Sequence, residues 1–235
     1  MDRIEQRILE ERKDEILAFG DDLWNHAERG FQEHRTAKKL KEALEKLGLP
    51  RIQTGLAVTG VKAYLKDPSE KTYAHTIALM GEMDGLPMPD HPNVDRETGV
   101  AHACWHNAQV AGVLGAAMAL SDPEVAAAID GNVVFFGCPA EEQGELDDLI
   151  QMESEGKIQY FGGKAQLIQE GALDDLDMIV AHHAMAFGAG INNMTTNCFV
   201  TKRVTFTGQA AHGTRAPFGV DALEAASLAM AAINT

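Results

Sequence analysis

Asn132-Val133-Val134-Phe135-Phe136-Gly137, followed directly by Cys138-Pro139-Ala140-Glu141-Glu142, is the stretch that decides the fold. A continuous apolar run such as Val133–Phe136 is typical of a central strand in a parallel sheet, covered on both faces. The two carboxylates follow the end of this run, where ligands gather in open α/β sheets. The stretch therefore predicts an α/β fold with an acidic site at the carboxyl ends of its strands.

The rest of the chain repeats this alternation of helix and strand patterns. Apolar residues at helical spacing predict helices over 4–27, 36–47 with Thr36 as N-cap, 104–120, 146–150 and 161–169. Strand patterns cover 56–65 with partial alternation, and 76–80 and 177–181 as short buried strands. Strands that alternate with helices predict a mostly parallel sheet with helices on both faces.

The pattern changes after Gly190, which predicts a second, smaller unit. Residues 197–207 alternate like a half-buried strand, and residues 222–233 form an amphipathic helical pattern. We therefore expect one domain over residues 1–194 and the beginning of another over 195–235.

Charge and cysteine content limit the class of protein. The 235 residues carry a net charge of −15, which disfavours nucleic acid and anionic membrane as partners because both would repel the chain. The charged N-terminus lacks a secretory h-region, and no apolar stretch approaches the ~20 residues that span a bilayer. Three widely spaced cysteines do not suggest a disulfide framework, so we expect a cytoplasmic protein.

Metal-binding residue types recur where successive elements end or begin. Glu82 and Asp84 follow the 76–80 strand, Cys104 and His106 open the 104–120 helix, Glu141 and Glu142 follow the 133–136 strand, and His182 and His183 follow the 177–181 strand. Consecutive residues of an extended segment point opposite ways, so at most one of the two histidines should enter the site. Thiol, imidazole and carboxylate ligands together suit Zn²⁺, and a second carboxylate beside a metal-bound water can act as general base. The pattern predicts a metallohydrolase.

Five blocks of the chain resemble the aminoacylase, carboxypeptidase G and indole-acetyl-amino-acid hydrolase family of di-metal amidohydrolases. Residues 28–33 with Thr36 resemble the family's "PELGFEE..T" block, and residues 82–87 resemble its "D-x-DALP" block. Residues 102–107 resemble "HACGHD/N", and residues 137–142 resemble "x-x-PAEE". Residues 208–213 with Pro217 resemble "GKxxHAAxP". Their order and spacing agree over nearly the whole chain. The resemblance implies a zinc-peptidase-like catalytic domain and the start of a smaller α+β lid and dimerisation domain, through which the complete protein forms a homodimer.

The resemblance also implies a role for each matching residue. The metal ligands would be Cys104, His106, Glu142 and His183, holding two divalent ions, with Zn²⁺ preferred and Mn²⁺ as the alternative. His183 is preferred to His182 because the family's ligand follows the block's Asp, here Asp177, by six positions. Glu141 would be the general base that takes the proton of the metal-bound water, and Asp84 would orient a ligand. His212, from the lid, would polarise the scissile carbonyl.

The implied reaction is hydrolysis of the amide bond of an N-acyl amino acid or a small peptide-like substrate. A dipeptidase or carboxypeptidase is the alternative enzyme, although Cys104 favours the amidohydrolase branch, since peptidase branches usually carry Asp there. Trp105 and Gln143 stand where the family has Gly, and the chain ends at Thr235, before the rest of the lid and one more His ligand. We therefore also expect an N-terminal fragment, with a non-catalytic metal-binding remnant or a split subunit as the alternative function.

Overall fold

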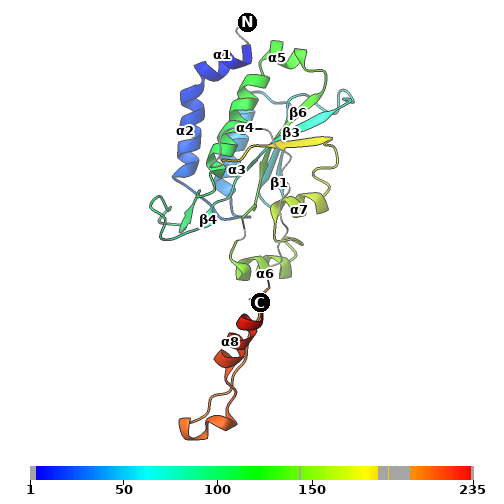
Figure 1. Cartoon of the computed structure of the whole chain (residues 1–235). Helices are drawn as coiled ribbons and strands as arrows, with labels where there is room; N and C mark the ends of the chain where they lie inside the picture. The colour runs from blue at the N-terminus through cyan, green and yellow to red at the C-terminus, as the bar shows by residue number, and fades with distance from the viewer. Residues whose placement is uncertain (1–3, 143, 185–189, 191–201, 234–235) are drawn as a thin grey trace. The chain divides into compact units, whose positions relative to one another are not determined.

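The computed structural model describes residues 4–142, 144–184, 190 and 202–233 (Figure 1). The chain divides into two compact units, Met1–Phe187 and Gly188–Thr235, each of which is described by itself. The predicted boundary between residues 194 and 195 lies outside the described residues.

The first unit is built on a five-stranded sheet with the order β1-β2-β6-β3-β7. The strands are β1 (Arg51–Leu56), β2 (Gly60–Tyr64), β3 (Thr76–Glu82), β6 (Asn132–Cys138) and β7 (Met178–Ala181). β6 is central and runs parallel to β3, which is parallel to β7, whereas β2 is antiparallel to both β1 and β6. The α/β prediction is confirmed, and the carboxyl ends of β3, β6 and β7 meet at one edge.

The apolar run in β6 is continuous because both faces of the strand are covered. Val134 and Phe136 belong to one buried cluster, and Phe135 belongs to the other, since side chains alternate along a strand. All three side chains are fully buried, which stabilises the fold by about 1.5–3 kcal/mol each. β6 therefore ties the two hydrophobic layers of the unit together.

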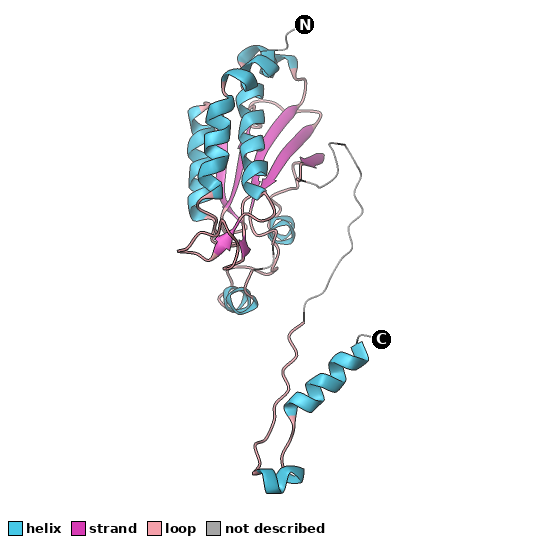
Figure 2. Ribbon diagram, turned by 60° about the vertical axis from the view of Figure 1, so that its left-hand side comes forward, coloured by secondary structure: helices cyan, strands magenta, loops and turns pink. Residues whose placement is uncertain are grey.

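Helices of the first unit cover both of these layers. They are α1 (Ile4–Glu11), α2 (Lys13–Trp24), α3 (His34–Lys46), α4 (His106–Leu120), α5 (Pro123–Ala128), α6 (Leu146–Ser154) and α7 (Gly163–Gln169). Figure 2 shows the longer helices side by side along one face of the sheet. α4 packs closely against β3, as the space at Gly81 shows: a Cβ atom there would come within 3.0 Å of the Gln109 backbone. Gly81 of β3, which has no side chain, permits this approach.

Two predicted helix boundaries differ from the structure. The 4–27 pattern forms two helices that are separated at Arg12. α3 begins at His34, so Thr36 lies inside the helix and is not its N-cap. The carboxylate of Glu28 instead accepts hydrogen bonds from the backbone N–H groups of Arg35 and Thr36, which satisfies donors of the first helical turn from outside the helix.

Two predicted strands also differ. Residues 56–65 form no single strand, because the chain turns after β1 and returns as β2. The apolar pattern predicts that β7 is buried, but Met178 is 56% exposed and Val180 is 47% exposed. In the described part of the chain β7 pairs only with β3, which leaves its other edge and its side chains uncovered.

Smaller elements complete the two units. β4 (Leu86–Pro87) and β5 (Val100–Ala101) form a two-stranded sheet in the first unit. The second unit contains η1 (Gly213–Phe218), a bridge between Gln209 and Val220, and α8 (Ala222–Ile233), which confirms the predicted helix. No strand forms over 202–207, and residues 197–201 of that predicted strand lie outside the described residues. Among the helices that the structure describes, none has the length and apolar character needed to cross a membrane.

Candidate metal centre

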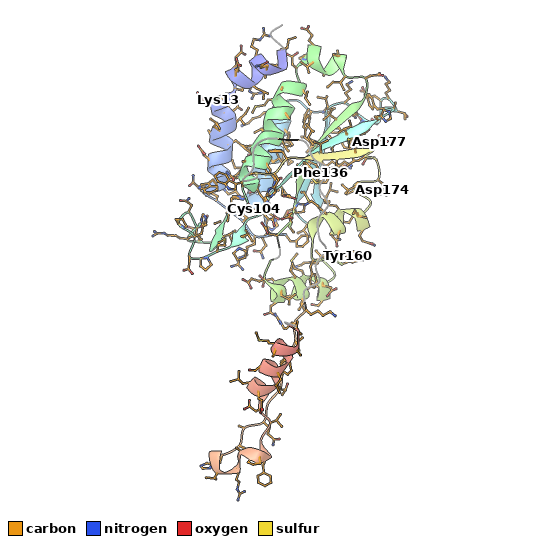
Figure 3. All side chains as sticks on the ribbon, viewed as in Figure 1. Lys13, Cys104, Phe136, Tyr160, Asp174 and Asp177 are labelled. Carbon is orange, nitrogen blue, oxygen red and sulfur yellow. The ribbon has the colours of Figure 1, made fainter. Side chains whose placement is uncertain are left out.

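Three of the predicted ligands come together where α4 begins and β7 ends. Cys104 and His106 lie at the N-terminal end of α4, near which Figure 3 labels Cys104, and His183 lies two residues after β7. The Cys104 Sγ atom is 3.2 Å from His183 Nε2, and the rings of His106 and His183 are 6.1 Å apart. One donor atom of each residue lies within 4.8 Å of the others, a separation that one bound ion can bridge.

The two consecutive histidines point to different neighbours. His183 approaches Cys104, whereas the ring of His182 lies against α4, where a Cβ atom at Gly112 would be 2.7 Å from its Nε2 atom. This arrangement agrees with the expectation that only one of them enters the site. The structure thus brings His183, and not His182, to Cys104, and the role of His183 as a ligand stays a prediction.

His106 is fixed by the segment that follows β3. Its Nδ1 atom lies 2.8 Å from the backbone oxygen of Asp84 and 3.2 Å from Asp84 Oδ1, and its side chain is fully buried. Burial alone would lower the pKa of His106, but its contacts with Asp84 and Glu82 raise it to about 10. A carbonyl acceptor at Nδ1 leaves Nε2 as the nitrogen available to a metal ion.

Asp84 joins the β3 end of the site to the loop that carries the paired carboxylates. Its side chain is fully buried, and its Oδ2 atom accepts a hydrogen bond of 2.8 Å from the backbone N–H of Glu142. One carboxylate thus touches both His106 and the Glu142 backbone. This geometry is what a residue that orients ligands requires.

Glu33 supports the same loop from the side of α3. Its buried carboxyl group accepts hydrogen bonds from the Ala140 N–H at 2.8 Å and from the Thr59 hydroxyl at 2.5 Å. Burial and the nearby charge of Asp84 raise the pKa of Glu33 to about 8. Ala140, at φ 48°, is in the left-handed region, so these contacts hold a strained residue immediately before Glu141.

Glu141 and Glu142 both lie near the three-residue cluster, but in different ways. Glu141 Oε2 is 3.9 Å from His106 Nε2, and burial followed by the charge of Glu82 raises the pKa of Glu141. Burial and the adjacent carboxylate of Glu142 raise the pKa of the Cys104 thiol to about 12 in the absence of metal. Glu142 is not part of either compact donor group found among the described residues, so its role as a ligand stays a prediction.

The second donor group consists of Glu82, His106 and Glu141. Glu82, the last residue of β3, lies with its Oε2 atom 3.1 Å from His106 Nε2, and its Oε1 atom pairs with the ammonium of Lys164. The sequence singles out Glu82 by its place at a strand end, but not as a site residue. Sequence reasoning misses Lys164, since a single lysine at the start of a helix carries no local signal.

The backbone at Trp105 adopts a conformation that glycine reaches more easily than other residues. Its φ of 63° is left-handed, a conformation that costs a non-glycine residue about 1–2 kcal/mol. The half-exposed indole packs against Trp24 of α2, with ring centroids 5.3 Å apart. Packing against Trp24 therefore offsets part of the strain. Gln143, the other departure from the family pattern, lies outside the described residues.

His212 belongs to the second unit. Its Nδ1 atom lies 2.9 Å from the Thr214 hydroxyl oxygen and accepts a hydrogen bond from the Thr214 N–H. These contacts fix the ring locally, ahead of η1. Its role at a scissile carbonyl stays a prediction.

The donor set of the first unit fits a divalent cation. Thiol, imidazole and carboxylate groups from separate segments converge, and the imidazole nearest their centre is fully buried. Zn²⁺ accepts such a mixture, and Mn²⁺ prefers its carboxylate part. The residues present are therefore those that a divalent metal needs.

Comparison with known proteins points to one family. The model of peptidase family M20/M25/M40 matches residues 78–233. The chain is 28% identical over 236 residues to one of the subunits of p-aminobenzoyl-glutamate hydrolase of Escherichia coli (strain K12), a match that covers 96% of this chain and 44% of that protein. It is 26% identical over 181 residues to N-acyl-L-amino acid amidohydrolase of Geobacillus stearothermophilus, a match that covers 76% of this chain and 43% of that protein.

A solved structure agrees with these sequence matches. The crystal structure of the Bacillus subtilis YXEP protein, described as a dinuclear metal-binding peptidase of the M20 family, superimposes with a TM-score of 0.54 at 27% identity. The match covers 71% of this chain and 41% of that one. The chain thus spans less than half the length of these similar proteins.

Proposed function

The chain belongs to peptidase family M20/M25/M40, and on that premise we propose that it carries the metal-binding part of an amidohydrolase. The substrate is an N-acyl amino acid or a small peptide-like amide, as the names of similar hydrolases suggest. The observation that carries the proposal is the convergence of Cys104, His106 and His183 within 4.8 Å. Membership of the family alone would not indicate that this chain binds a metal, whereas a compact cluster of a thiol and two imidazoles supports metal binding.

Two divalent ions, Zn²⁺ or Mn²⁺, are the proposed cofactors, held by Glu142 and by the compact donor group of Cys104, His106 and His183. Bound there, they would supply the Lewis acidity that activates water and polarises the amide carbonyl. Asp84 holds the imidazole of His106 so that Nε2 faces the site. The same carboxylate fixes the backbone of Glu142, so one residue sets the geometry of two proposed ligands.

Glu141 is the proposed general base. It receives the proton of the attacking water and returns it to the leaving amine, which lets a single group serve both steps. Burial and Glu82 raise the pKa of Glu141, and a raised pKa brings a carboxylate closer to the neutral range where a base works best. His212 is proposed to stabilise the charge that develops on the carbonyl oxygen.

A test compares Glu141→Gln with Glu145→Gln, an exposed carboxylate four residues along the same segment. We expect Glu141→Gln to lower kcat for N-acetyl amino acids or p-aminobenzoyl-glutamate by ~10²-fold or more, because general-base catalysis contributes at least that much. Glu145→Gln should retain activity. Equal activity of the two variants would remove Glu141 as the base.

A dipeptidase or carboxypeptidase is the alternative enzyme, and cleavage of dipeptides in preference to N-acetyl amino acids would favour it.

A non-catalytic metal-binding remnant or a split subunit is the second alternative, motivated by the chain's length relative to its relatives. If the chain binds metal but turns over amides only after a second polypeptide, matching the part of its relatives that this chain does not cover, is added, the split-subunit alternative holds. Turnover by the chain alone would exclude both non-catalytic alternatives.

Dimerisation and cellular location are further predictions. A homodimer through the second unit is supported only by the family resemblance. A cytoplasmic location is proposed because the three widely spaced cysteines of the sequence do not suggest a disulfide framework.

A further inference from the structure

Lys164 places a positive charge against one side of the candidate metal centre. It lies in the first turn of α7, and its ammonium pairs with Glu82 Oε1 although the side chain is 47% exposed. The other carboxylate oxygen of Glu82 accepts a hydrogen bond of 2.9 Å from Gln109 Nε2 and lies 3.1 Å from His106 Nε2. Glu82 therefore stands between the lysine and the imidazole.

The position of Lys164 is set by the loop that carries the proposed base. The backbone N–H of Gly163 donates a hydrogen bond of 2.8 Å to the Ala140 oxygen, one residue before Glu141. A Cβ atom at Gly163 would collide with the Pro139 oxygen, so only glycine allows this contact. The start of α7 is thus held beside the carboxylate loop, and Lys164 is not a surface lysine that meets Glu82 by chance.

Two donor groups share one histidine, His106. Cys104 and His183 form one group with His106, while Glu82 and Glu141 form the other. Because Nδ1 of His106 is engaged with Asp84, only Nε2 is available, and one nitrogen binds one ion. A cation at His106 must therefore sit toward the thiol side or toward the carboxylate side.

The ammonium of Lys164 biases this choice. It pairs with Glu82, a member of the carboxylate group, and its positive charge repels a divalent cation placed there, whereas on the thiol side the Cys104 Sγ atom and His183 Nε2 lie 3.2 Å apart.

We infer that Lys164 is a positioning residue that directs the cation at His106 toward Cys104 and thereby favours Zn²⁺ over Mn²⁺. The inference rests on the proposed function, since it assumes a metal at this centre. Thiolate ligands suit Zn²⁺ and carboxylates suit Mn²⁺, so the side that the ion occupies sets the metal preference.

The test measures Zn²⁺ and Mn²⁺ affinities of the purified chain by competition with a chelator. Lys164→Met keeps most of the apolar stem and removes the charge, and it should shift the ratio of the two affinities toward Mn²⁺ by about tenfold or more, because a full charge near a divalent ion is removed. At one equivalent of Co²⁺, the thiolate-to-cobalt absorption should weaken in the same variant. Lys164→Arg should restore wild-type behaviour.

Two further variants keep the inference falsifiable. Lys157→Met removes an exposed lysine that pairs with Glu155 and should change neither readout. Glu82→Gln combined with Lys164→Met should abolish the gain for Mn²⁺, because the carboxylate group is then incomplete. The inference is overturned if Lys164→Met matches Lys157→Met, or if its gain survives the loss of Glu82.

Failure of the proposed function gives a different result. If wild-type protein shows no Cys104-dependent Co²⁺ absorption, the proposed centre is wrong, whatever Lys164→Met does to Mn²⁺ binding. If metal binding behaves as expected but no amide is cleaved, the activity fails while the role of Lys164 stands.

Discussion

Replacing Glu33 by Gln tests how the carboxylate loop is held in place. The amide oxygen of Gln can still accept the Ala140 N–H, and its NH₂ group can donate to the Thr59 oxygen once that hydroxyl turns. The variant therefore keeps the contacts and removes the ionisable group. Glu33→Ala instead leaves a buried N–H without its partner.

The magnitude follows from proton linkage. Burial raises the pKa of Glu33 from 4.5 to about 8, so the folded state binds the proton more tightly than the unfolded state. The stability that this proton provides is fully present below pH 4.5 and is lost as the pH rises through 8. Between about pH 5.5 and pH 7.5 the loss is on the order of 2–3 kcal/mol, from 1.36 kcal/mol per pH unit.

Urea unfolding at several pH values provides the assay. The free energy of unfolding of Glu33→Gln, relative to wild type, should increase by about 2–3 kcal/mol over that interval. Glu42→Gln, an exposed carboxylate of α3, controls for the loss of a surface charge. A difference between Glu33→Gln and wild type that stays constant with pH would refute the assignment of a buried, protonated Glu33.

Three other predictions concern the metal centre and its flanking turn. Trp105→Ala should be less stable than Trp105→Gly by about 1 kcal/mol in urea unfolding, because both variants lose the contact with Trp24 and only Gly relieves the left-handed strain. Equal stability of the two variants would show that the turn is unstrained. Asp84→Asn should weaken Zn²⁺ binding by about 10- to 100-fold in a chelator competition, because His106 loses the carboxylate that orients it. Unchanged Zn²⁺ affinity would show that Asp84 does not orient the ligand. Without metal, the pKa of Cys104 is raised to about 12 and that of His106 to about 10, so both ligands must lose a proton when Zn²⁺ binds. Zn²⁺ affinity should therefore rise by about a hundredfold per pH unit across the neutral range, and calorimetry in two buffers should detect the released protons. An affinity that does not depend on pH would mean that neither residue is a ligand.

Local patterns in the sequence predict the core of the fold. Val133–Phe136 indicates a central strand because both of its faces are covered, and the structure has it there. Cys104, His106 and His183 can be found because each stands at the end of an element, and parallel strands bring such ends together. Such signals are carried by neighbours in sequence, which is why a single sequence contains them.

Contacts between distant segments carry no such signal. The Lys164–Glu82 pair joins residues 82 positions apart, and the hydrogen bond from Ala140 to Glu33 spans 107 positions. The exposure of β7 escapes prediction for a related reason, since an apolar strand pattern indicates burial whether or not another segment covers the strand. Partners that only the folded chain brings together determine these features.

Metal content of the purified chain tests the central claim most directly. Elemental mass spectrometry should find at least one Zn²⁺ or Mn²⁺ per wild-type chain, which His183→Ala loses and His182→Ala retains. The two variants remove the same side chain from adjacent positions, so a general loss of stability would affect both. Absence of a retained ion in the wild-type chain, or equal metal content in the two variants, would contradict a centre built on Cys104, His106 and His183.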